Sequence, residues 1–328
     1  MNPHLTFNLV SDVHQLLAYQ FMVNALQAAG IVAVTAAVVG WFMVVRAETF
    51  AGHTLSMMSF PGAAAAALAG LPLAWGYFAF CGVGALVIAG SSSRRGRPRS
   101  LGRQSAVVGM VGAGALAVGY LLLSLYGGVL ESLETLLFGS IFGVTRGEVL
   151  TLAIVGVCAI AFLVVVGRPL LFASVDRSLA AAGGVPVGLL SAGFLFVLGL
   201  AVAATAQITG VLLVFALLLA PAAIARELTP RIGLGLALSV LLGLVIAWVG
   251  LGLSYFTNDP AGFFVTSIAL ALFAAARLAR GGLAGGLRGR GAAGGRHGGG
   301  LHGLDAAGGR PDAHHGHAAS LPHPAGGH

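Results

Sequence analysis

The chain has 328 residues, of which 58% are hydrophobic and only 8% are charged, and its formal net charge is +7. Soluble domains carry about 25% charged residues, so the composition excludes an ordinary water-soluble domain and predicts a polytopic membrane protein. All seventeen basic residues are arginines, which excludes a P-loop with its phosphate-binding lysine.

The fold class that we expect is all-α, with about nine transmembrane helices in one membrane domain, residues 19–280. A helix crosses a bilayer with about 20 mostly apolar residues. Such runs occupy 19–45, 54–71, 73–90, 105–125, 149–167, 187–205, 206–225, 232–255 and 261–278. Residues 1–18 form a short N-terminal segment. Residues 281–328, rich in Gly, Ala, Arg and His, lack hydrophobic periodicity, and we expect a disordered tail there.

The arginines predict how the chain is oriented in the membrane. Short cytoplasmic loops collect positive charge, and residues 91–103 carry five arginines. Nine spans place the N-terminus outside and the C-terminal tail in the cytoplasm, with every arginine except Arg146 on the cytoplasmic side. Because the positive charge follows this pattern, we expect no binding of nucleic acid.

Two stretches do not behave as simple spans. Residues 136–143, LLFGSIFG, are too short to cross, so we expect a re-entrant or interfacial helix on the outer side. The run 206–225 is long enough to cross but contains Gln207, Gly210 and Pro221. An unsatisfied polar group in hydrocarbon costs several kcal/mol, so Gln207 should face protein or a water-lined cavity.

Three motifs in this order resemble those of the permease subunits of ABC-type zinc and manganese importers. Residues 136–141 resemble the LLFGSIL segment of that family. Residues 174–186 resemble its cytoplasmic loop, FD-x-x-x-A-x-x-x-GVP, and residues 207–225 resemble the helix that follows. The resemblance extends from roughly 21 to 280.

The resemblance implies a transporter subunit in the plasma membrane that binds no cofactor of its own. Two copies of the chain would form the pathway for a divalent metal ion, with zinc the first expectation and manganese the next. A separate cytoplasmic subunit would bind and hydrolyse ATP, so this chain would not itself be an enzyme. An extracytoplasmic metal-binding protein would deliver the ion.

A fourth segment keeps the family's frame but changes its metal-binding residues. Relatives read GD-x-LSHA-x-LPG, whereas here the Asp position holds His53 and the His position holds Met57. An imidazole and a thioether replace a carboxylate and an imidazole, on one face if the segment is helical. Imidazole suits zinc, copper, iron and nickel, whereas thioether favours copper(I).

The candidate residues for the metal path are therefore His53, Met57 and Gln207, each with a structural alternative. His53 could cap or hydrogen-bond a helix end while Met57 serves packing. Gln207 could hydrogen-bond a neighbouring helix.

By the same resemblance, the loop after the fifth span would be the coupling helix that seats in a groove of the ATPase subunit. It would transmit ATP-driven closure as a rigid-body movement of helices. The residues that carry this resemblance are Asp176, Arg177, Ala182, Gly184 and Pro186.

Two other functions stay open from the sequence. An ABC permease for a metal chelate, of the siderophore or cobalamin type, would need a wide polar cavity, whereas His53 lining a narrow path favours a bare ion. A metal-responsive membrane sensor would use the tail, which holds seven of the ten histidines. The sequence contains no HExxH or GxSxG motif for an intramembrane enzyme.

Overall fold

The structure is a computed structural model that describes residues 18–92, 101–126, 139, 141–211, 214–257 and 259–294. By internal contacts the chain divides into two units, Met1–Gly282 and Leu283–His328. The fold below is that of the first unit.

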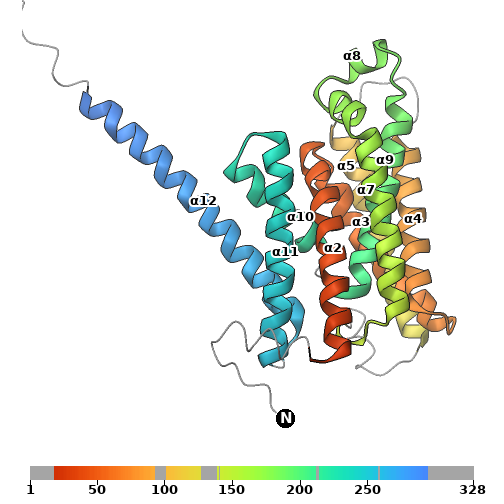
Figure 1. The fold of residues 1–328 in the computed structure, drawn as a ribbon. Helices are drawn as coiled ribbons and strands as arrows, with labels where there is room; N and C mark the ends of the chain where they lie inside the picture. Colours follow the sequence, from red (N-terminus) through yellow and green to blue (C-terminus); the bar gives the residue numbers. More distant parts are fainter. Residues whose placement is uncertain are drawn as a thin grey trace, which may run out of the picture. The chain divides into compact units, whose positions relative to one another are not determined.

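The regular structure of the described residues is entirely helical, which confirms the all-α prediction (Figure 1). The helices are α2 (Gln20–Val45), α3 (Thr49–Leu68), α4 (Leu73–Ser92), α5 (Leu101–Tyr126), α7 (Arg146–Val175), α8 (Arg177–Ala182), α9 (Val187–Thr209), α10 (Val214–Leu228), α11 (Ile232–Thr257) and α12 (Ala261–Gly294), with a 3₁₀ turn η1 (Ile141–Gly143).

Helix α2 is the core of the bundle, with α7, α9, α10 and α11 packed around it. In its most apolar window 72% of residues are buried, against 22% in α5 and α7. Small residues allow this: a Cβ added at Gly40 would overlap the carbonyl oxygen of Leu218 in α10. Ser239 of α11 donates to the carbonyl oxygen of Ala37 at 3.2 Å. Close backbone approach of this kind is the usual basis of helix association in membranes.

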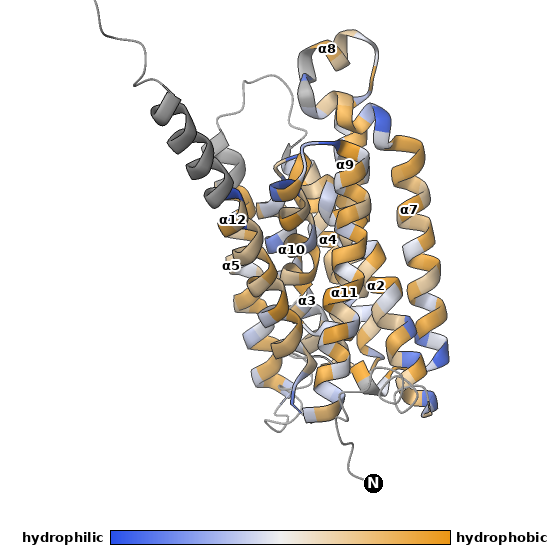
Figure 2. Cartoon of the chain, turned by 60° about the vertical axis from the view of Figure 1, so that its left-hand side comes forward, coloured by the Kyte–Doolittle hydropathy of each residue, from blue (hydrophilic) through white to orange (hydrophobic). Residues whose placement is uncertain are grey.

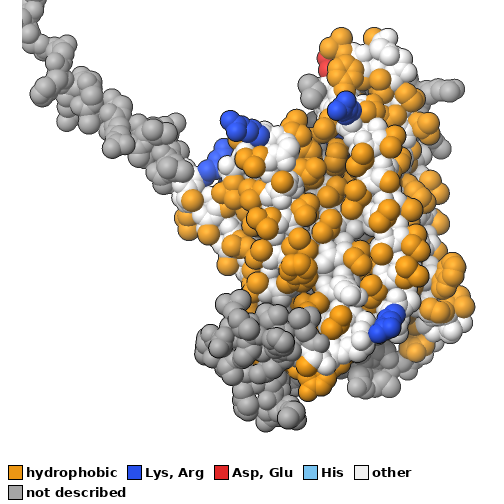
Figure 3. Space-filling view, viewed as in Figure 1, with side chains coloured by type: hydrophobic (Ala, Val, Ile, Leu, Met, Phe, Trp, Pro, Cys, Tyr) orange, Lys and Arg blue, Asp and Glu red, His pale blue; other side chains and the backbone are white. Residues whose placement is uncertain are grey.

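The outward surface of the bundle is apolar along most of its length. Side chains such as Val157 and Val165 of α7 are 67% and 77% exposed, and hydrophobic side chains cover most of the face in Figure 3. Hydrophilic residues gather toward the helix ends (Figure 2). By length and composition, seven of the described helices could cross a membrane: α2, α4, α5, α7, α9, α11 and α12. The expectation of about nine spans is not confirmed by this measure.

The expected span 206–225 is wrong, because a break divides it. Helix α9 continues to Thr209 and ends at Gly210, whose φ of +71° is a conformation that glycine adopts without strain. The next helix, α10, begins at Val214 and has only 15 residues. Gln207 and Gly210 marked this run as an unusual span, but its length and overall apolar character predicted one continuous helix.

The start of α10 lies within the depth of the bundle. Leu218, one turn into α10, meets Gly40, which is five residues before the end of α2. Gly139, from the LLFGSIFG motif, lies at the break: a Cβ there would overlap the carbonyl oxygen of Ile208. The other residues of 136–140 lie outside the described part of the chain, so the expected re-entrant helix is not tested beyond η1.

The expected start of the tail at residue 281 is not confirmed. Helix α12 continues past it to Gly294, although half of residues 281–294 are glycine, which is a weak helix former. Residues 295–328 lie outside the described residues.

The contact between α3 and α4 yields a test of the packing. Gly62 and Gly76 face each other, and a Cβ on either would overlap the carbonyl oxygen of the other. We predict that Gly76→Ala forces the helices apart and lowers the stability by about 1–3 kcal/mol. Thermal unfolding of the purified protein in detergent measures this as a lower apparent Tm. Gly90→Ala, in the same helix with no atom near its added Cβ, should not lower the Tm. Equal Tm values for the two variants would contradict the packing.

Candidate translocation site

His53 lies near the start of α3 and faces the first turn of α10. Its ring packs edge-on against that of Phe215, with 4.9 Å between the ring centroids. Its Nδ1 atom is buried and has no hydrogen-bond partner. The neighbouring hydroxyl of Ser56 donates to the carbonyl oxygen of His53 itself at 2.6 Å, so it does not serve the imidazole. The structure thus gives His53 no helix-capping bond at Nδ1.

The break before α10 places unpaired backbone groups at the same point. The first N–H groups of any helix lack an intrahelical acceptor. Non-helical backbone at membrane depth is tolerated where it is buried in protein or lines a water-filled cavity. Broken helices of this kind occur at the binding sites of transporters. The side of α3 that carries His53 therefore faces the first backbone N–H groups of α10, which are polar, inside an otherwise apolar bundle.

Met57 is on the same helix but packs elsewhere. A Cβ added at Gly112 of α5 would lie 3.3 Å from the Met57 sulfur. The side chain of Met57 is only partly buried. The structure therefore places His53 against α10 and Met57 against α5.

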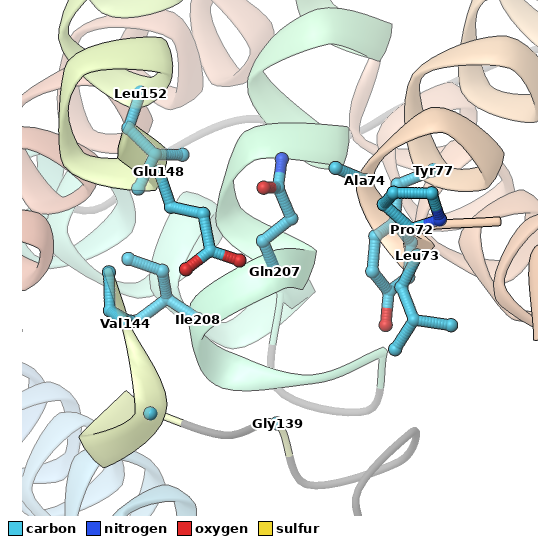
Figure 4. A pocket seen from close by; sticks show the side chains of 11 residues that line it. Pro72, Leu73, Ala74, Tyr77, Gly139, Val144, Glu148, Leu152, Gln207 and Ile208 are labelled. Atoms are coloured by element: carbon cyan, nitrogen blue, oxygen red, sulfur yellow. The ribbon is translucent and has the colours of Figure 1, made fainter. Parts of the chain in front are cut away.

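Gln207 lines a separate cavity of about 250 Å³, at the end of the bundle where α2 begins (Figure 4). Its Nε2 atom is buried and has no hydrogen-bond partner among the described residues, so this nitrogen packs against protein while other atoms of Gln207 line the cavity. Neither His53 nor Met57 lines the cavity. The lining residues are Pro72, Leu73, Ala74, Tyr77, Gly139, Gly143, Val144, Glu148, Leu152, Gln207 and Ile208.

Sequence reasoning missed Glu148, the acidic residue of this cavity. Its carboxylate accepts from the backbone N–H of Thr145 at 2.8 Å and from the Thr145 hydroxyl at 2.9 Å. The Thr145 hydroxyl in turn accepts from the N–H of Glu148, which completes a capping box at the start of α7. The Thr-x-x-Glu spacing before an apolar run was the signal that could have located it.

The loop between α7 and α9 has the compact form expected of a coupling helix. Asp176 accepts from the N–H of Leu179 at 3.0 Å and so caps α8, which begins at Arg177 and ends at Ala182. Gly184 has a φ of +80°, and the N–H of Val185 reaches back to the carbonyl oxygen of Ala180. This is a Schellman ending, in which glycine is favoured.

Pro186 then stands immediately before α9, as its N-cap. The described part of the loop therefore has a defined start and a defined end. A capped start and a Schellman ending give the loop one defined backbone geometry.

Among the residues that the structure describes, no three His, Cys, Asp or Glu side chains come together in a metal-binding group. A closed, tightly binding site within one copy would need about four such ligands. The arrangement around His53 can instead offer one imidazole nitrogen beside a helix break.

An apolar helical bundle that contains a broken helix and isolated polar groups in its interior defines a polytopic membrane protein of the transporter class. Residues 18–280 match the ABC 3 transport family, and the chain belongs to that family.

The chain is similar to named proteins over most of its length. It is 29% identical over 269 residues to the manganese transport system membrane protein MntC of Halalkalibacterium halodurans, covering 82% of this chain and 90% of that protein. It is 27% identical to the chelated iron transport system membrane protein YfeC of Yersinia pestis, covering 78% and 85%. Among solved structures, PsaBC from Streptococcus pneumoniae in complex with Fab has a TM-score of 0.70 at 25% identity, covering 81% of this chain and 94% of that chain.

The unpaired imidazole leads to a stability prediction. His53→Leu removes a buried polar atom that has no partner, so the stability should stay the same or rise. Thr54→Val is the matched control, because the Thr54 hydroxyl donates to the carbonyl oxygen of Val108 at 3.3 Å. That variant should lose about 1 kcal/mol. Apparent Tm values in detergent compare the two. A Tm for His53→Leu well below that of Thr54→Val would mean that His53 has a structural partner.

Proposed function

We propose that this chain is the membrane-spanning subunit of an ABC importer that carries a bare divalent metal ion across the plasma membrane. Zinc is the expected ion and manganese the next. The observation that carries the proposal is the buried Nδ1 atom of His53, which has no hydrogen-bond partner among the described residues and belongs to a ring packed against Phe215 at the start of α10.

The choice of ion follows from ligand chemistry. Manganese prefers carboxylate, carbonyl and water ligands, whereas imidazole suits zinc, iron, copper and nickel. The Asp of the related proteins is His53 here, which favours zinc over manganese. The named relatives transport manganese or chelated iron, which supports a metal as the cargo.

A weak site suits a transporter. An ion must bind well enough to enter the path and weakly enough to leave it. One imidazole binds a cation more weakly than a closed site of several ligands, and the positive end of the α10 dipole weakens the binding further. We propose that Gln207 lines the outer part of the path and that Met57 contributes a soft ligand in another conformation of the transporter.

The assembly that we propose has two copies of this chain, a cytoplasmic ATP-binding subunit and an extracytoplasmic metal-binding protein. A second copy would supply further ligands, since the described part of one copy offers no three-residue cluster. Residues 19–280 would form the permease domain, with the N-terminal segment 1–18 outside and the tail 281–328 in the cytoplasm.

The end of the bundle that carries α8 would then face the cytoplasm. The loop residues Asp176, Arg177, Ala182, Gly184 and Pro186 would seat in the ATP-binding subunit. The exposed ion pair between Arg280 and Glu227, at 2.8 Å, lies near the ends of α12 and α10 that this orientation places on the cytoplasmic side.

Metal accumulation tests the proposal. Cells that lack the chain are compared with cells carrying wild type or His53→Ala, and manganese, iron, cobalt, nickel, copper and zinc are measured by elemental analysis. We expect a zinc deficit of several fold that wild type restores and His53→Ala does not. Ser124→Ala is the control variant, because the exposed Ser124 hydroxyl of α5 donates to the carbonyl oxygen of Leu121 in its own helix turn; it should restore the zinc.

Three results would change the proposal. A deficit in manganese alone would move the ion from zinc to manganese. A deficit that His53→Ala repairs in full would remove His53 from the path. No deficit in any free metal, with loss of uptake of a metal chelate, would favour the chelate permease, to which the name of the YfeC relative points.

A further inference from the structure

The corner between α2 and α3 holds a buried ion pair. Arg46 caps the C-terminus of α2 and Glu48 precedes α3, and their side chains are 4% and 12% exposed. The guanidinium Nη2 donates to a carboxylate oxygen of Glu48 at 2.8 Å. Ion pairs on the surface contribute little, but a buried arginine whose partner is removed destabilises strongly. This corner is therefore held in one geometry.

The same guanidinium reaches both helices that flank α8. Nη2 also donates to the hydroxyl of Ser191 in α9 at 2.9 Å, and Nη1 donates to the carbonyl oxygen of Leu170 in α7 at 3.4 Å. Its Cζ atom lies 5.0 Å from the centre of the Phe194 ring, a cation–π contact with α9. Leu170 precedes α8 and Ser191 follows it, so the Arg46 side chain contacts both helices, α7 and α9, that lead into the α8 loop.

The corner also holds the two helices that meet at His53. Helix α3 starts directly from it, and His53 is one turn beyond the start of that helix. Helix α10 is tied to it by Arg226, whose Nη1 donates to the carbonyl oxygen of Val44 at 3.3 Å. Contacts through this corner thus connect the loop around α8 to both sides of the candidate path.

The backbone of the corner is unusual. The N–H of Glu48 reaches the carbonyl oxygen of Met43, and the N–H of Ala47 reaches that of Val44, which is a Schellman ending. The equivalent endings of α3 and α8 place Gly70 and Gly184 in the left-handed conformation, whereas here Ala47 adopts it, with φ +56°. Left-handed backbone at a residue other than glycine persists where surrounding contacts over-determine it.

We propose that Arg46 is a coupling residue. It transmits displacement of the α8 loop to α3 and α10, so that ATP-driven movement at the loop opens or closes the path at His53. This rests on the proposed function, because it needs an ATP-binding subunit at α8. Shape as well as charge is required: the planar guanidinium bonds to α3, α7 and α9 at once, and an ammonium group cannot reproduce that fork.

The test is the number of metal ions imported per ATP hydrolysed. The full transporter, this chain with its ATP-binding subunit and metal-loaded binding protein, is reconstituted in vesicles, and zinc uptake and phosphate release are measured together. Arg46→Lys should lower the ratio about tenfold, and Ser191→Ala, which removes one bond to α9, about threefold. Ser124→Ala, on α5 and hydrogen-bonded to Leu121 in its own turn, should keep the wild-type ratio.

The outcomes separate this inference from the proposed function. If wild type imports no zinc, the proposed function with zinc as its cargo fails. If wild type imports zinc and the Arg46 and Ser191 variants keep its ratio, the coupling role is wrong. A parallel fall in uptake and ATP hydrolysis, with an unchanged ratio, would assign Arg46 a purely structural role. Should Arg46→Lys not fold, Ser191→Ala and Glu48→Gln decide the question alone.

Discussion

Backbone hydrogen bonds in this chain have to be made without water, and the break between α9 and α10 is the place where that constraint is hardest to meet. The N–H of Gly210 still reaches the carbonyl oxygen of Ala206 at 3.0 Å, which completes the last turn of α9. Gly139 covers the break so closely that no side chain fits there. Protein therefore packs directly against the described backbone at the end of α9.

This constraint explains why the small residues of α2 matter. A short helix such as α10 cannot span the bilayer alone and has to be held by its neighbours. Because Gly40 has no Cβ, which would overlap the carbonyl oxygen of Leu218, the backbone of α10 can lie directly on α2. Arg46 caps the C-terminus of α2. The helix that packs against α10 therefore also carries the side chain that bonds α7 and α9, the helices on either side of α8. Support of the path and its coupling to the α8 loop are therefore combined in one element.

The sequence predicted those features that depend on local pattern. Runs of apolar residues located most of the helices to within a few residues, and the Gly-Val-Pro motif located the end of the α8 loop at Gly184 and Pro186. It did not predict the break at Gly210, because the run 206–225 as a whole is apolar and long enough to cross a bilayer despite Gln207 and Thr209. Glycine is so frequent in this chain that no single one stands out.

The contacts of the candidate site were harder to predict, because they join distant residues. Arg46 bonds Ser191, which is 145 positions away, and His53 meets Phe215 through the folding of α10 onto α2. The family resemblance selected His53, but nothing in the local sequence indicated that its Nδ1 atom is unpaired. The sequence also contained no sign that Gln207 and His53 lie apart. They do so because Gln207 belongs to α9, before the break, whereas His53 packs against α10, after it.

The central claim is that metal passes between α3 and α10 at residue 53, and metal protection of a thiol at that position tests it most directly. The chain is prepared with Cys81→Ala, Cys158→Ala and His53→Cys, and a small water-soluble thiol reagent is added to membranes with and without zinc. Thiolate is a good zinc ligand. The account predicts that the reagent labels residue 53 and that zinc slows the labelling at least several fold, whereas magnesium does not. Labelling that zinc leaves unchanged, or a residue that the reagent never reaches in the working transporter, would contradict it.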